Sequence, residues 1–124
     1  MVNNIFTHSS ILEKALDAVQ LRHEVISHNI ANGDTPGYKK QGVAFEEYLQ
    51  KALDTTNKPS QIDLSSLSPR LISQVNSMST RMDGNNVDPE VETVELAKNQ
   101  MRGQALSDYV AQDMKRFKIV LNAR

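Results

Sequence analysis

The sequence contains no cysteine, so it forms no disulfide and offers neither a thiolate metal ligand nor a thiol nucleophile. Its net charge is only −1, because 14 Lys and Arg stand against 15 Asp and Glu. Such a balance creates no overall field that attracts nucleic acid or an anionic membrane surface. The chain also lacks the roughly 18 consecutive apolar residues of a membrane span. Its first residues have neither the basic nor the apolar region of a cleaved signal peptide, so we expect no ordinary secretion signal.

Apolar residues are sparse for a folded domain. Counted with glycine and without tyrosine, they make up about 40% of the chain, below the roughly 45–50% of ordinary globular domains. With 124 residues the chain has the length of a single domain. The composition therefore predicts one domain whose own core is small.

A long helix is predicted near the N-terminus. Ser10 and Glu13 have the spacing of a capping box, which satisfies unpaired backbone N–H groups, so we expect the helix to begin there. One apolar face follows at helical spacing: Leu12, Leu16, Val19, His23, Ile26 and Ile30. A second strip broadens it, formed by Ile11, Ala15, Ala18 and Val25. Two glycines and Pro36 are expected to end the helix within residues 32–37.

A second long helix is predicted at the C-terminus. Asp88 suits the N-cap and Pro89 the first helical position, and the helix is expected to continue close to residue 122. Its apolar face consists of Leu106, Val110, Met114, Phe117 and Leu121. The two apolar faces either pack on each other within one chain or bury against other chains.

The segment between the helices carries weaker signals. Residues 45–53 are expected to form a short helix with Phe45, Leu49 and either Ala52 or Leu53 inward. The composition of residues 55–69 predicts a loop, and residues 71–82 allow a short strand. The sequence thus predicts an all-α fold: an elongated, coiled-coil-like antiparallel pair of terminal helices with a loop-rich middle. The segments 1–38, 39–87 and 88–124 together form one domain.

No arrangement of side chains predicts catalysis or ligand binding. His23 and His28 are five residues apart, whereas two helical zinc ligands are four apart, so we expect no metal site. The glycines of residues 33–37 match no nucleotide-binding loop, and no acid pair or nucleophile–base spacing stands out. We expect no cofactor and no small-molecule substrate. The position of His23 on the apolar face leaves a mild pH dependence of assembly open.

Residues 29–38 read Asn-Ile-Ala-Asn-Gly-Asp-Thr-Pro-Gly-Tyr and directly follow the first predicted helix. This segment resembles the N-I-A-N-x-x-T-P-G-Y signature of the axial proteins of the bacterial flagellar rod and hook. The matching residues are Asn29, Ala31, Asn32, Thr35, Pro36, Gly37 and Tyr38. Residues 43–49 and 83–88 are similar to further segments of that family. Gly103 departs from it, because relatives commonly have an aromatic residue there.

The resemblance implies a non-enzymatic structural subunit of the proximal rod of the flagellar basal body. Such a subunit polymerises through its terminal helices, whose apolar faces form the assembly interface, and it transmits motor torque. The resemblance also implies export through the flagellar type III apparatus without a cleaved signal. The implied partners are the chain itself, other rod proteins, the adaptor between rod and membrane ring, and the export gate. Two alternatives stay open: another rod protein of the family, and a small helical adaptor or export chaperone.

Overall fold

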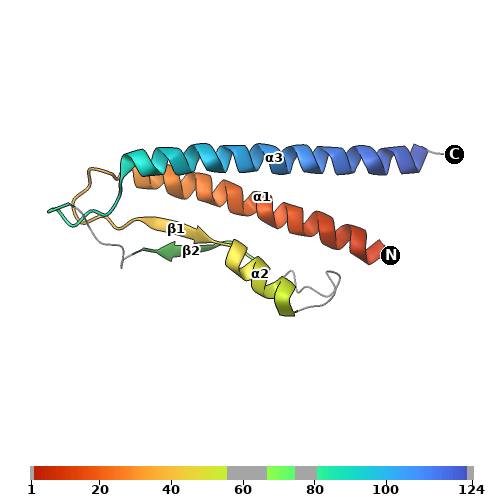
Figure 1. Ribbon diagram of the computed structural model, residues 1–124, viewed down its shortest axis with the longest axis horizontal. Helices are drawn as coiled ribbons and strands as arrows, with labels where there is room; N and C mark the ends of the chain where they lie inside the picture. Colours follow the sequence, from red (N-terminus) through yellow and green to blue (C-terminus); the bar gives the residue numbers. More distant parts are fainter. Residues whose placement is uncertain (1, 56–66, 75–80, 123–124) are drawn as a thin grey trace.

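The computed structural model describes residues 2–55, 67–74 and 81–122, which form an elongated pair of helices with a small sheet and a short helix alongside (Figure 1). In chain order the elements are α1 (Val2–Ala31), β1 (Gln41–Ala44), α2 (Glu46–Thr55), β2 (Arg70–Ser73) and α3 (Pro89–Asn122). α1 and α3 lie side by side and antiparallel, so both chain ends lie at the same end of the molecule (Figure 1). The predicted fold class is confirmed, with a two-stranded sheet added.

α1 begins at Val2, so the prediction that it begins at the capping box of Ser10 and Glu13 is wrong. No glycine or proline stands between Val2 and Ser10, and nothing there interrupts the helix. Ser10 therefore occupies an interior helical position, where the backbone N–H groups are already bonded within the helix. The helix has 30 residues, which corresponds to a length of about 45 Å.

α3 begins as the sequence predicted. Asp88 Oδ1 accepts hydrogen bonds from the backbone N–H groups of Glu90 at 3.0 Å and Val91 at 3.4 Å, and Pro89 is the first helical residue. The helix ends at Asn122 after 34 residues, about 50 Å. Neither α3 nor any other helix among the described residues has an apolar stretch long enough to cross a bilayer.

The small sheet pairs β1 with β2 in antiparallel register, with Gln41 opposite Ser73 and Ala44 opposite Arg70. The sequence predicted a strand near β2 but not β1, because the residues of β1 lack the alternation of β-branched and polar side chains that marks a strand. Side chains of α1 bond the edge of β1 that faces away from β2. Asn29 bonds the backbone N–H and carbonyl of Gln41, and Arg22 donates to the carbonyl of Val43 at 3.4 Å.

The apolar core lies between α1 and the segment that follows β1. Its buried members are Ala18, Phe45 and Leu67, and the half-buried side chains of Ile11, Ala15, Leu49 and Ala52 pack against it. Three members of the second apolar strip, Ile11, Ala15 and Ala18, therefore face α2 and its flanking residues, whereas Val25 is buried beside β1. The predicted inward positions of Phe45 and Leu49 are confirmed, and the third is Ala52 rather than Leu53, which is exposed.

An ion pair ties α2 to α1 at the edge of this core. Arg22 Nη2 lies 2.6 Å from Glu46 Oε2. Burial alone would raise the pKa of Glu46. The hydrogen bond from Arg22, a backbone hydrogen bond and the charges of Arg22 and Arg102 together outweigh burial and hold that pKa below its ordinary value. A carboxyl group whose pKa is lowered by folding stabilises the fold above its unfolded pKa, about 4.3 for Glu, and loses this effect as the pH falls further.

We expect the pair to stabilise the chain by about 0.5 kcal/mol at neutral pH, because the Glu46 carboxylate is 58% exposed and solvent screens it. Urea unfolding of the native chain and of Glu46→Gln should show this difference in the free energy of unfolding at neutral pH. This difference should shrink as the pH falls below the ordinary pKa of Glu, about 4.3, and vanish once the pH has passed the lowered pKa of the folded carboxyl group. An equal difference at neutral and at acid pH would contradict the assignment of this stability to the ion pair.

Candidate functional site

The signature turn after α1 is built around the fully buried side chain of Asn29. Its Nδ2 donates to the carbonyl of Gln41 at 2.8 Å and to Oε2 of Glu92 at 3.0 Å. Its Oδ1 accepts from the backbone N–H of Gln41 at 3.0 Å and from the hydroxyl of Tyr38 at 3.2 Å. This one amide therefore joins α1, β1 and α3.

A second buried asparagine, Asn85, holds the turn from the opposite side. Its Nδ2 lies 3.0, 3.0 and 2.9 Å from the carbonyl oxygens of Asn32, Gly33 and Thr35. Its Oδ1 accepts from the backbone N–H of Val87 at 2.8 Å, just before α3. The segment between β2 and α3 is thereby fastened to the segment after α1.

The remaining signature residues shape this turn. Gly37 adopts a φ of 72°, a conformation that favours glycine, and its N–H donates to the carbonyl of Asp83 at 2.9 Å. The hydroxyl of Thr35 donates to Asn32 Oδ1 at 3.2 Å. Ala31 and Pro36 are exposed. The signature therefore marks the point at which the two long helices are joined.

Glu92 of α3 is 1% exposed and lies at the centre of this region. Lys40 Nζ contacts its Oε1 as an ion pair, and Asn29 bonds its Oε2. We call the four side chains Asn29, Lys40, Asn85 and Glu92 the polar junction. An ion pair with so little solvent access depends on every partner being present, because each unpaired charge is costly to bury.

Asn99 continues the polar contact along α3. Its Nδ2 donates to the backbone carbonyl of Val19 in α1 at 2.9 Å, while its Oδ1 has no hydrogen-bond partner among the described residues. Glu92 and Asn99 are the buried residues of α3, and both are polar. Neither was predicted from the sequence, although their spacing from each other and from Leu106 is the heptad repeat that places all three on one face.

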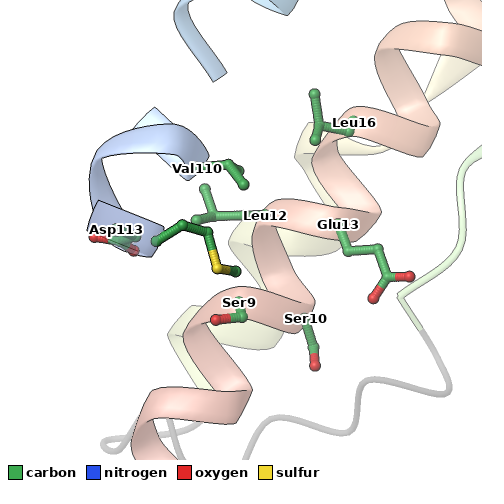
Figure 2. A pocket seen from close by; sticks show the side chains of 8 residues that line it. Ser9, Ser10, Leu12, Glu13, Leu16, Val110 and Asp113 are labelled. Carbon is green, nitrogen blue, oxygen red and sulfur yellow. The ribbon is translucent and has the colours of Figure 1, made fainter. Parts of the chain in front are cut away.

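The apolar faces of both helices meet further along the pair. Leu12 and Leu16 of α1 line a groove with Val110 and Met114 of α3. Figure 2 shows Leu12 pointing toward Val110, whereas Ser10 and Glu13 point away from α3. Val19, Leu12 and Leu106 line a second groove, which also contains Phe45.

The predicted interface residues differ widely in exposure. Ile26 is buried, whereas His23, Ile30 and Phe117 are half-buried. Met114 is 55% exposed and Leu121 is 80% exposed. Part of the predicted surface is thus covered by the chain's own helices, and the use of these residues in assembly stays a prediction.

Gly103 allows α1 and α3 to approach closely. A Cβ at this position would lie 3.0 Å from Cγ1 of Val19, which is closer than such atoms ordinarily pack. A larger side chain would push the helices apart or displace Val19. Glycine at position 103 therefore accompanies a tight helix contact, at a helix-propensity cost of about 1 kcal/mol relative to alanine.

Contacts between the helices continue toward the free end of the pair. His8 Nε2 lies 3.5 Å from Asp113 Oδ2, and the His8 and Tyr109 rings meet edge to face with centroids 5.8 Å apart. Beyond them, α3 carries Ile119, Val120 and Leu121 with large exposed fractions. The side chains that the structure describes include no group of three potential metal ligands.

These features define an elongated, mainly helical protein in which a polar turn holds two long terminal helices together. The family model "Flagella basal body rod protein" matches residues 11–39. The flagellar basal body rod protein FlgB of Bacillus subtilis is 35% identical over 89% of each chain. FlgB of Borreliella burgdorferi is 33% identical over 86% of this chain and 89% of its own. FlgB of Buchnera aphidicola is 30% identical over 97% of this chain and 96% of its own.

The chain belongs to the FlgB family of flagellar basal body rod proteins. It is a structural subunit of the basal-body rod, where it assembles with other rod components. The names of these relatives describe rod proteins rather than enzymes.

Proposed function

We propose that the chain polymerises into the proximal rod through the far halves of α1 and α3, while the polar junction keeps the two helices paired at their near end. The observation that supports this proposal is the exposed apolar cluster at the end of α3. Ile119, Val120 and Leu121 are 68%, 72% and 80% exposed. A monomer gains nothing from leaving such side chains in water, whereas burial between subunits stabilises by about 25 cal/mol per Å² of apolar surface.

The distribution of polarity along α3 supports this division. Its buried residues, Glu92 and Asn99, lie in the first half and are polar, so that half is matched to specific partners in α1. In the second half, Leu106, Val110 and Phe117 are only half-buried, and Met114 is exposed. Apolar contacts of this kind accept neighbouring helices with less restriction on geometry than hydrogen bonds do.

The same proposal covers the wider role. The chain acts without catalysis or cofactor, transmits motor torque along the rod, and leaves the cell through the flagellar type III apparatus without a cleaved signal. Its further partners are the adaptor that joins rod to membrane ring and the export gate. The paired helices and the closed polar junction support torque transmission, because hydrogen bonds join both helices and β1 at one point.

Replacement of Leu121 by Asp tests the proposal. The side chain is 80% exposed, so the helix content and thermal unfolding of the free chain should stay unchanged. In a subunit contact the new carboxylate would lose its hydration without a partner, at a cost of more than about 3 kcal/mol. We therefore expect few or no rods in electron micrographs of purified basal bodies, and loss of swimming, when this variant replaces the native chain.

Gln100→Asp is the matched control, because it adds the same charge at an exposed polar position in the first half of α3, outside the proposed contact, and should leave rods intact. Normal rods with Leu121→Asp would contradict the proposed contact.

Hydrogen exchange of the free chain distinguishes a rod subunit from a small helical adaptor or export chaperone. Helix ends that exchange fast alone and slowly with other rod proteins support the rod, whereas a stable dimer with protected ends would favour an adaptor or export chaperone.

A further inference from the structure

Asn32–Gly33 is the one Asn–Gly step in the sequence, and it lies within the signature turn. The signature leaves the two positions after the second asparagine open, and this chain has glycine in the first of them. In an Asn–Gly step no Cβ hinders the backbone nitrogen of the glycine from attacking the asparagine side chain. The step is therefore the sequence context in which an asparagine most readily forms a succinimide.

The reaction needs only water. The Gly33 nitrogen loses its proton and bonds to Asn32 Cγ, the bond from Cγ to Nδ2 breaks, and ammonia leaves. Water then adds to one of the two ring carbonyls and opens the succinimide to aspartate or isoaspartate. The net change replaces an amide by a carboxylate and, in isoaspartate, routes the main chain through the former side chain.

In the folded turn both reacting groups are engaged. The Gly33 N–H donates to the carbonyl of Ile30 at 3.1 Å. Asn32 Nδ2 donates to the carbonyl of His28 at 2.8 Å, and the Thr35 hydroxyl donates to Asn32 Oδ1 at 3.2 Å. The attacking nitrogen of Gly33 is thus bonded to the carbonyl of Ile30, while the side-chain amide of Asn32 is held toward the carbonyl of His28.

The backbone on both sides of the reacting bond is held as well. The carbonyls of Asn32 and Gly33 both accept from Asn85 Nδ2 at 3.0 Å. Arg81 Nη1 also donates to the Gly33 carbonyl, at 2.8 Å, and Gly33 is buried. Rotation of the Asn32 backbone toward ring closure therefore requires the contacts of Asn85 to break first.

We propose that Asn32 is a site of spontaneous covalent modification, closed while the polar junction is formed and open whenever the chain is unfolded. The product does not fit the turn. An aspartate side chain at this position carries only acceptors where the amide of Asn32 donates to His28, and isoaspartate lengthens the main chain before Thr35. Modification in the unfolded state therefore blocks later formation of the turn.

Peptide mapping by mass spectrometry tests this on the full chain, incubated in mildly alkaline buffer with and without urea. Isoaspartate is separated from aspartate by its cleavage pattern. We expect modification at Asn32 in urea, and a rate at least about tenfold lower in the native chain, since the rate follows the population of the opened form. Asn85→Ala in native buffer should bring the rate close to that in urea.

Gly33→Ala in urea is the control, because its effect there does not depend on folding, and it should slow the reaction strongly. Equal rates in native buffer and in urea would overturn the protection by the turn. Absence of the product in urea would overturn the site itself. An Asn85→Ala chain as resistant as the native one would show that the junction does not control the reaction.

Discussion

Lys40→Met should lower the free energy of opening of the polar junction by about 3–5 kcal/mol, because it leaves the carboxylate of Glu92 buried without its countercharge. Glu92 is 1% exposed, and among the described residues the remaining partner of its carboxylate is the amide of Asn29. Methionine preserves the length and apolar stem of lysine, so the change isolates the charge. Hydrogen exchange of the Gly37 and Val87 amides reports the opening, since both are bonded inside the turn.

Two further variants check the cause. Lys98→Met removes a similar ion pair, with Glu95, that is exposed to solvent, and should cost less than about 1 kcal/mol. Combining Lys40→Met with Glu92→Leu should recover most of the loss, because no buried charge then remains. If Lys40→Met and Lys98→Met cost the same, burial of the Glu92 carboxylate is not what makes the junction sensitive.

Asn85→Ala is the second change with a large expected effect, about 3 kcal/mol, because each buried polar group that loses its partner costs about 1–3 kcal/mol. It removes a side chain that is fully buried and leaves the carbonyls of Asn32, Gly33 and Thr35 without this donor. The same exchange measurement applies, and rods formed by this variant should be fewer because the helices lose their fixed junction.

Asp34→Ala provides the reference within the same turn. Its side chain is fully exposed, and its ion pair with Arg81, at 3.6 Å, is open to solvent, so its loss should change stability far less than Asn85→Ala does. A loss as large as that of Asn85→Ala would mean that the turn is sensitive to any change of sequence. The assignment of the effect to the buried amide would then fail.

Local signals explain which elements could be predicted from the sequence. The N-cap at Asp88, the stop after Ala31 and the inward positions of Phe45 and Leu49 each depend on residues close in sequence, and all agree with the structure. The predicted start of α1 was wrong because a capping box describes a pattern that is also compatible with a helix interior. β1 was missed because it is held by residues distant in sequence: it pairs with β2, and side chains of α1 bond its other edge.

The polar junction could not be predicted from the sequence for a related reason. Asn29 and Glu92 are 63 positions apart, and Asn85 and Thr35 are 50 apart, so no local pattern pairs them. Glu92 in isolation is a favourable charge in the first turn of α3, an ordinary exposed role. The signature asparagine was singled out by resemblance, but its partners were not.

The sequence by itself determined that two long amphipathic helices flank a loop-rich middle segment and that a turn ends the first helix, because helical periodicity, caps and breakers act within a few residues. The tertiary structure alone decided which face each helix shows to its partner and which charges lose contact with water. Glu92 and Lys40 are ordinary exposed charges in any local segment. The packing of α1, β1 and α3 removes the Glu92 carboxylate from water, and Lys40, whose side chain is 23% exposed, then supplies its countercharge. Burial is a property of the whole packing, and the free energy of the junction depends on it.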